Sequence, residues 1–171
     1  PLGIVEIPTE QIVGTKTNSR SNAFASNFMP ILEEDSEFAQ KWSNLSTSHV
    51  EEGIRDPIKV YEYMNKFYVE EGNKRVSVLK YFDAPFIHGD VIRMVPKRTN
   101  QLENIIYHEF VDFYDLTKIN YIWFSKEGSF QKLQELVGKD PGEPWTEDDC
   151  MDFRSIFLRF KMEFEKKNKN L

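Results

Sequence analysis

The sequence predicts an α+β fold class, in which a small mixed sheet with helices is followed by an α-helical C-terminal extension. Segments rich in β-branched and aromatic residues alternate with helical segments up to about Arg98, and helical spacing dominates afterwards. A chain of 171 residues with 40% hydrophobic residues is long enough for a small domain with an appendage. We therefore expect a first domain over residues 1–98 and a helical extension over residues 99–171 packed on it.

Composition and spacing mark the N-terminal elements. A strand is expected over about Gly3–Ile7, then a turn or short helix, and the Ser- and Asn-rich segment Thr15–Phe28 is expected to be a loop. A helix is expected from its N-cap Ser36 to Gly53, since glycine favours helix C-termini and Pro57 prevents continuation. Apolar residues recur in it at helical spacing: Phe38, Trp42 and Leu45.

A hairpin, a helix and a further strand follow. The segment "PIKVYEYMNKFYVEEG" holds two runs of strand-forming residues separated by a turn at Asn65-Lys66. A helix is expected from about Lys74 to Tyr81, and "VIRMVPK" is expected to be a strand that ends near Pro96.

Three helices are expected in the extension. The segments "ENIIYHEFVDFYDLT" and "SFQKLQELVGK" have helical spacing, the second with Ser129 as N-cap and Gly138 as stop. The last helix begins with a capping-box pair, Thr146 and Asp149. Its stripe of apolar residues predicts either a core-facing surface or a seam for a partner helix, as in a homodimer. The stripe is Cys150, Phe153, Phe157, Phe160 and Phe164.

Composition excludes several classes. A net charge of −6 argues against a general DNA-coating role, because that role needs Lys and Arg to neutralise phosphates. No run approaches the roughly 20 apolar residues of a membrane span, and no signal segment is seen, so we expect no membrane partner and a cytoplasmic location. The single Cys150 fits a reducing compartment, and the histidines have no metal-ligand spacing, so no metal site is expected. Because the chain begins at Pro1, we expect a processed chain or a fragment.

The segment "EEGNKR" holds the main candidate site. A strand, Gly72 and a helix N-terminus present backbone N–H groups that bind anions. Lys74 and Arg75 oppose the helix dipole at this end, which an anion in front of them would explain. The alternative is a plain strand–turn–helix in which the two cations are solvated. Glu70 and Glu71 would then partly offset the unfavourable interaction of the cations with the helix dipole.

The segment "IRDPIKVYEYMNKFYVEEGNKRVSVLKYF" resembles the ParB N-terminal/sulfiredoxin superfamily. The family pattern Pro-Ile-x-Val, a hairpin and Gly-x-x-Arg-x-x-Ala has counterparts in Pro57-Ile58-x-Val60 and in Gly72 and Arg75, with Val78 in place of the alanine. The resemblance covers roughly residues 3–97. It implies that the loop holds nucleotide phosphates, with CTP or ATP and Mg²⁺ as the candidate ligands.

Departures from the family pattern restrict the activity. Sulfiredoxins carry a reactive cysteine where this chain has Asn73, so their chemistry is not expected. A free-serine kinase branch has two histidines at the positions of Asn73 and Lys74, which leaves Glu71 as a weak candidate for a catalytic base. Without a metal-binding carboxylate cluster, a nuclease is not expected either. We predict no enzymatic activity, and if there is one it is that of a nucleoside triphosphatase or kinase.

Partition-type ParB proteins, which are bacterial, carry a further Glu-Asn-x-x-Arg box before a DNA-reading helix-turn-helix. The segment "ENIIY" begins like this box but places Tyr107 at the arginine position, and the acidic segments that follow do not suit a DNA reader. We therefore predict a regulatory or interaction module that binds a nucleotide or other phosphate ligand. The alternatives are a DNA-binding transcriptional or partition-type regulator and an ATP-dependent small-molecule kinase of the free-serine type. The residues predicted to bind the phosphate or nucleotide are Gly72, Asn73, Lys74, Arg75, Arg20, Thr15 and Arg55.

Overall fold

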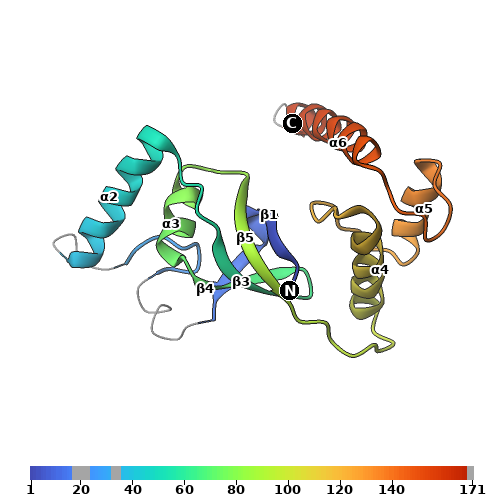
Figure 1. Cartoon of the computed structure of the whole chain (residues 1–171), viewed down its shortest axis with the longest axis horizontal. Coiled ribbons are helices and arrows are strands. Elements are labelled where there is room, and N and C mark those ends of the chain that lie inside the picture. The colour runs from blue at the N-terminus through green and yellow to red at the C-terminus, as the bar shows by residue number, and fades with distance from the viewer. Residues whose placement is uncertain (17–23, 32–35, 169–171) are drawn as a thin grey trace. The chain divides into compact units, whose positions relative to one another are not determined.

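The protein is described by a computed structural model over residues 1–16, 24–31 and 36–168. It divides into two compact units, Pro1–Lys97 and Arg98–Leu171 (Figure 1), and each is described here by itself. The division lies one residue before the domain boundary that the sequence predicts.

The first unit is built on a mixed sheet of five strands in the order β1-β5-β3-β4-β2. The pairs β1–β5 and β3–β4 are antiparallel, and the pairs β3–β5 and β2–β4 are parallel. The α+β class with a small mixed sheet is therefore confirmed. The strands are β1 (Gly3–Pro8), β2 (Ile12–Thr15), β3 (Ile58–Tyr63), β4 (Lys66–Glu71) and β5 (Phe86–Arg93).

Two helices stack on this sheet in layers. The helix α3 (Asn73–Tyr81) turns Val76 and Leu79 into the sheet's apolar core, and α2 (Glu37–Glu52) lies on the far side of α3 (Figure 1). A hydrogen bond of 2.8 Å from Trp42 Nε1 to Ser77 Oγ ties the two helices together. The core thus holds α3, and with it the turn before α3, at a fixed place above the sheet.

The helix boundaries of α2 agree with the sequence prediction. Ser36 accepts a hydrogen bond from the Ala39 N–H at 3.1 Å, and Gly53 ends the helix with φ 79° and donates its N–H to the His49 carbonyl. A short 3-10 turn η1 (Thr9–Gln11) also appears where a turn or short helix is expected.

Three details of the sheet differ from the predictions. The strand β2 was not predicted, because only its parallel pairing with β4 and the burial of Ile12 make it a strand. The hairpin turn is formed by Met64 and Asn65, both at positive φ, so β4 already includes Lys66. Finally, β5 ends at Arg93 rather than near Pro96.

The second unit contains three helices around an aromatic core. They are α4 (Leu102–Thr117), α5 (Ser129–Leu136) and α6 (Glu147–Asn168). The rings of Phe110 and Phe113 in α4 contact the ring of Phe130 in α5, with centroids 5.9 and 5.1 Å apart. The N-cap of α5 is Gly128 and not Ser129 as predicted. The predicted helical character of the extension is confirmed.

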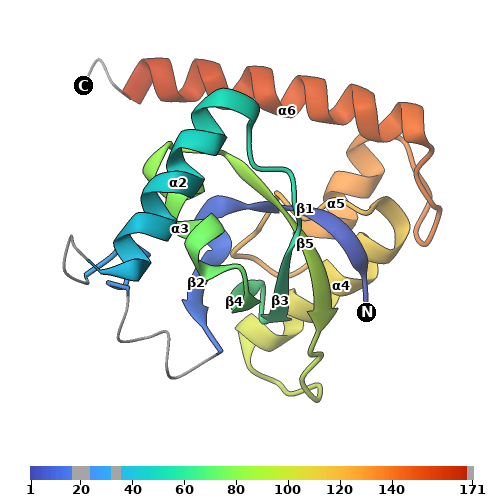
Figure 2. The same cartoon turned by 60° about the vertical axis from the view of Figure 1, so that its left-hand side comes forward.

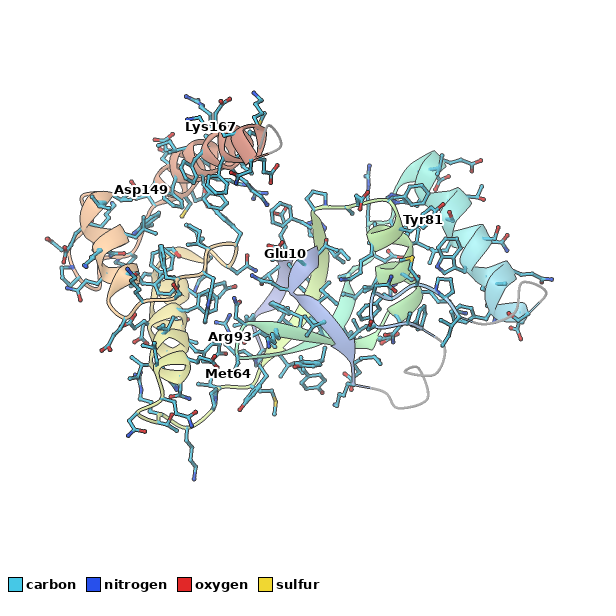
Figure 3. All side chains as sticks on the ribbon, turned by 180° about the vertical axis from the view of Figure 1, so that it is seen from behind. Glu10, Met64, Tyr81, Arg93, Asp149 and Lys167 are labelled. Carbon is cyan, nitrogen blue, oxygen red and sulfur yellow. The ribbon has the colours of Figure 1, made fainter. Side chains whose placement is uncertain are left out.

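The long helix α6 is continuous over its whole length (Figure 2), and Asp149 and Lys167 mark its two ends (Figure 3). The predicted capping box is present: Thr146 donates its N–H to Asp149 at 2.7 Å, and Asp149 donates its N–H to the Thr146 hydroxyl at 3.2 Å. Acids fill its first turn and lysines its last, as predicted.

The aromatic stripe of α6 is only partly covered. Phe153 and Phe157 contact Trp145 and Tyr121, with ring centroids 5.4 and 5.1 Å apart. In contrast, Phe160 and Phe164 are 66% and 56% exposed, and none of the described residues of α6 is buried. The core-facing interpretation thus fails for Phe160, where the helix has run past the aromatic core, and the partner-helix seam stays a prediction. In the part of the chain that the structure describes, no helix combines the length and apolar character needed to cross a membrane.

A buried ion pair fixes the hairpin end of the sheet. The carboxylate of Glu62, which is fully buried, accepts a hydrogen bond from Arg93 Nε at 2.7 Å and another from the Asn65 N–H at 2.7 Å. Arg93 and Met64 lie together at this end (Figure 3). The carboxylate therefore joins β5 to the turn between β3 and β4.

Replacing Arg93 by Met should destabilise the first unit strongly. The change leaves the Glu62 carboxylate buried without its cation, which typically costs about 3–5 kcal/mol. Urea unfolding should show this loss, and the double variant Glu62→Met/Arg93→Met should recover part of it. Lys41→Met, which removes an exposed ion pair with Glu37, is the control and should change little. Equal effects of Arg93→Met and Lys41→Met would contradict the structural role of the buried pair.

The capping box of α6 should make the second unit sensitive to acid. Hydrogen bonds from Lys139 and Thr146 lower the pKa of Asp149 from 3.8 to about 2. Because the pKa is lower in the folded state, the carboxylate stabilises the fold above about pH 4, and this contribution is lost as the pH falls toward about 2. Asp149→Asn should therefore unfold at lower urea than wild type at neutral pH, and the gap should close on acidification. Asp148→Asn, in the same helical turn, is the control and should show a smaller gap, because the bonds with Lys139 and Thr146 belong to Asp149.

Candidate phosphate-binding site at the Gly72 turn

The turn between β4 and α3 is made by Gly72 in a left-handed conformation, with φ 105° and ψ 22°. A Cβ at this position would lie 2.6 Å from Ile58 Cγ2, so no side chain fits. The N-terminus of α3 consequently has no side-chain cap, and the helix begins with Asn73, one residue earlier than predicted. An uncapped helix N-terminus is a place where an anion is stabilised.

This helix end opens into a cavity of about 360 Å³. The lining combines the turn with side chains from the strand before it and from distant segments. The lining residues are Phe24, Leu45, Glu70, Gly72, Asn73, Lys74 and Arg75. The structure thus brings together four predicted site residues, Gly72–Arg75, as expected from their adjacency, and gives them a cavity to face.

Asn73 is the buried polar group of this cavity. Its side chain is 6% exposed, and its Oδ1 atom has no hydrogen-bond partner among the described residues. An unpaired buried carboxamide oxygen costs about 1–3 kcal/mol, so such groups are rare unless a ligand or water pairs with them. Asn73 therefore combines a place in the cavity lining with a buried oxygen that no described residue pairs.

The two acids before Gly72 are paired with other cations. Glu70 accepts a hydrogen bond from Lys16 at 3.1 Å, and Glu71 pairs with Lys59 at 2.6 Å. The ion-pair partners of these two acids are thus cations of neighbouring segments, and the charge of Arg75 adds to the effect of Lys59 in lowering the pKa of Glu71.

Lys74 and Arg75 occupy different surroundings. The ammonium group of Lys74 lies over the ring of Phe38, 4.6 Å from its centroid. Arg75 Nη1 donates to the carbonyls of Asp56 and Pro57 at 3.1 and 2.9 Å, which holds the start of β3 against α3. Arg75 thus has a structural role in addition to lining the cavity.

A second cavity of about 250 Å³ shares Phe24 and Asn73 with the first. It is lined mostly by small and apolar residues: Val13, Gly14, Thr15, Phe24, Ala25, Ser26, Phe28 and Asn73. The predicted site residue Thr15 belongs to this second cavity, and its hydroxyl donates to the Val69 carbonyl at 3.1 Å. Asn73 therefore lies where a cationic cavity and a mainly apolar cavity meet.

Of the other predicted residues that the structure describes, Arg55 and Glu71 line neither cavity. Arg20 lies outside the described residues. Arg55 is exposed in the connection between α2 and β3 and lines neither cavity. Glu71 is exposed, and its hydrogen bond with Lys59, with a weaker effect of Arg75, lowers its pKa. A lowered pKa makes this carboxylate a poor proton acceptor, which argues against it as a catalytic base.

Sequence reasoning missed the aromatic residues of the site. Phe24 lines both cavities, and Phe38 holds the ammonium of Lys74. An isolated phenylalanine within the polar segment Thr15–Phe28 is the one sequence signal that could have indicated Phe24. The contact between Lys74 and Phe38 depends on the tertiary placement of α2 and has no local signal.

Two further observations concern the other candidate chemistries. Tyr107, which stands at the arginine position of the ParB box, is fully buried in the second unit and so belongs to its core. Over residues 1–16, 24–31 and 36–168, no group of three or more His, Cys, Asp or Glu could hold a metal ion.

Comparison with known proteins finds similarity only in structure. The sequence matches no protein-family model and no curated protein. Among solved structures, the chain is similar to sulfiredoxin from Arabidopsis thaliana, with 23% identity and a TM-score of 0.38 over 53% of this chain and 85% of that one. It is also similar to the C-terminally truncated chromosome-partitioning protein ParB from Caulobacter crescentus complexed with CTP-gamma-S. Identity there is 13%, with a TM-score of 0.38 over 81% of this chain and 72% of that one.

Gly72→Ala should destabilise the first unit more than a left-handed conformation alone would explain. A non-glycine residue at positive φ costs about 1–2 kcal/mol, and here the new Cβ also meets Ile58. Gly128→Ala is the matched control, because Gly128 is likewise a left-handed N-cap but has no heavy atom within 4 Å of its Cβ position. Urea unfolding of both variants should show the larger loss for Gly72→Ala. Equal losses would mean that the contact with Ile58 does not constrain the turn.

Proposed function

We propose that the first unit is a regulatory or interaction module that binds a phosphate-bearing ligand, foremost a nucleotide, at the Gly72 turn. The observation that supports this best is the uncapped N-terminus of α3, which opens into a cavity beside the buried and unpartnered Asn73 oxygen. Backbone N–H groups at such an end and the side chains of Lys74 and Arg75 complement a phosphate. An anion offers the two cations a reason to be at the positive end of the helix.

The two adjoining cavities favour a nucleotide over inorganic phosphate. In this proposal the phosphates occupy the cavity beside Lys74, and the organic part lies in the mainly apolar cavity beyond Asn73. CTP or ATP with Mg²⁺ are the first ligands to test. Glu70 is the carboxylate in the lining of the first cavity, and Mg²⁺ bound with the nucleotide would lower the repulsion between this carboxylate and the phosphates.

The alternative functions receive less support from the molecule. A DNA-binding regulator has to overcome a net charge of −6, and the ParB box ends in the buried Tyr107. A small-molecule kinase of the free-serine type needs a base, and the lowered pKa of Glu71 makes it poorly suited. Ligand binding without a reaction is therefore the function that the geometry supports best.

Nucleotide binding should depend on Lys74. We expect isothermal titration of CTP, ATP and GTP, with and without Mg²⁺, to show binding to the wild type. Lys74→Met should weaken it about tenfold to a hundredfold, because a hydrogen bond to a charged group contributes about 1.5–3 kcal/mol. This variant is cleaner than Arg75→Ala, which also removes the bonds to Asp56 and Pro57.

Lys66→Met is the matched control, since Lys66 is exposed at the opposite end of β4. It should leave binding unchanged. The absence of any binding to wild type at millimolar nucleotide would overturn the nucleotide proposal, and equal losses for Lys74→Met and Lys66→Met would place the ligand elsewhere.

A further inference from the structure

The second unit contains a cavity of its own, of about 210 Å³, which we call the α4–α5 cavity. One wall is a single face of α4, because its lining residues there follow the helical spacing i, i+3, i+4 and i+7. The other walls come from α5 and from the connection to α6. The lining residues are Glu109, Asp112, Phe113, Leu116, Phe130, Gln131, Gln134, Pro141 and Gly142.

The floor of the α4–α5 cavity is aromatic. The rings of Phe113 and Phe130 lie with their centroids 5.1 Å apart at an angle of 37°, and both side chains are buried. Leu116 continues this apolar surface along α4. Aromatic faces attract cations as well as apolar groups, so the floor suits a cation that is carried on an apolar stem.

The wall around the floor is rigidly built. The side chain of Gln134, which is 4% exposed, donates to the carbonyls of Asp140 and Glu143 at 2.9 and 2.8 Å and accepts from Trp145 Nε1 at 3.0 Å. These three bonds hold the connection between α5 and α6 against α5. This wall of the cavity is therefore fixed by a buried side chain.

The charge of the lining has one sign. Glu109 and Asp112 are its charged residues, with no Lys, Arg or His in the lining. Both oxygens of Glu109 lie 3.0 Å from the Gly128 N–H, which fixes the carboxylate at the start of α5. Asp112 has an outside partner, Arg98, at 3.7 Å, and both side chains are about 70% exposed. Such a pair is weak and easily exchanged, and it shows that a guanidinium can approach Asp112 from solvent.

We propose that the α4–α5 cavity binds an arginine side chain of a partner protein. The planar guanidinium would lie on the Phe113–Phe130 floor with the carboxylates of Glu109 and Asp112 beside it, and the aliphatic stem would contact Leu116. The volume is below the roughly 300–1,000 Å³ of small-molecule sites, which fits one side chain better than a whole metabolite. This proposal is independent of the nucleotide proposal, because it uses only residues of the second unit.

The indole N–H of Trp145 is a built-in reporter for this cavity. It donates to Gln134, and the Trp145 ring contacts the Phe113 ring with centroids 5.6 Å apart. In ¹H–¹⁵N correlation spectra of the full chain, an acetylated and amidated Gly-Gly-Arg-Gly-Gly peptide should shift this signal progressively at millimolar concentration. The same peptide with citrulline, the neutral isostere of arginine, should not shift it.

Two matched variants test whether the carboxylate of Asp112 contributes to binding of the arginine peptide. Asp112→Asn should weaken the arginine peptide about threefold to fivefold, as expected for one partly exposed ion pair. Asp115→Asn should not weaken it, because Asp115 is exposed on the same helix but does not line the cavity. Equal shifts with the citrulline peptide, equal losses in the two variants, or no shift of the Trp145 signal with the arginine peptide would each overturn the proposal.

Discussion

The close contact between Gly72 and Ile58 is the constraint on which the candidate site depends. Gly72 has no Cβ, so the chain can turn left-handed here and bring the start of α3 directly against β3. In any other residue the Cβ would lie 2.6 Å from Ile58 Cγ2. Arg75 then reaches the carbonyls of Asp56 and Pro57 and holds the same junction from the helix side. The turn that exposes the helix end is thus also the joint between the hairpin and α3.

This joint explains how the charges around the turn are divided. Glu70 and Glu71 lie at the end of β4 and form ion pairs with Lys16, directly after β2, and with Lys59 of β3. Lys74 belongs to the helix, and its ammonium lies over the ring of Phe38. An anion in the cavity would complement this cation at the positive end of the helix, so the test of the nucleotide proposal uses Lys74.

Local signals were sufficient for much of the fold. The caps of α2 and the capping box of α6 lie where Ser36, Gly53 and Thr146 predict them, because capping depends on a few adjacent residues. The strand β2 could not be predicted in the same way, since Ile12 becomes a strand residue only through pairing with β4. The aromatic stripe of α6 has regular helical spacing, but the spacing alone does not predict that Phe160 is exposed.

The site shows the same division between local and tertiary information. The glycine and the cations are adjacent in sequence, so the turn itself was predictable. The cavities were not predictable in this way, because Phe24 in their lining lies about 50 residues before the turn. The pairing of Glu71 with Lys59 likewise depends on the folded chain. The segment "EEGNKR" alone therefore predicts an anion site but does not predict the cavities beside it.

The side chain of Asn73 is suited to binding a ligand and not to converting it chemically. A carboxamide can donate and accept hydrogen bonds, but it is neither a nucleophile nor a base at neutral pH. The nearest carboxylate in sequence that could serve as a base, Glu71, has its pKa lowered by Lys59. A buried amide can instead discriminate between ligands, because only a ligand that donates a hydrogen bond to its oxygen removes the free-energy cost of leaving that oxygen unpaired. These side chains therefore suit the proposed binding of a ligand better than its conversion.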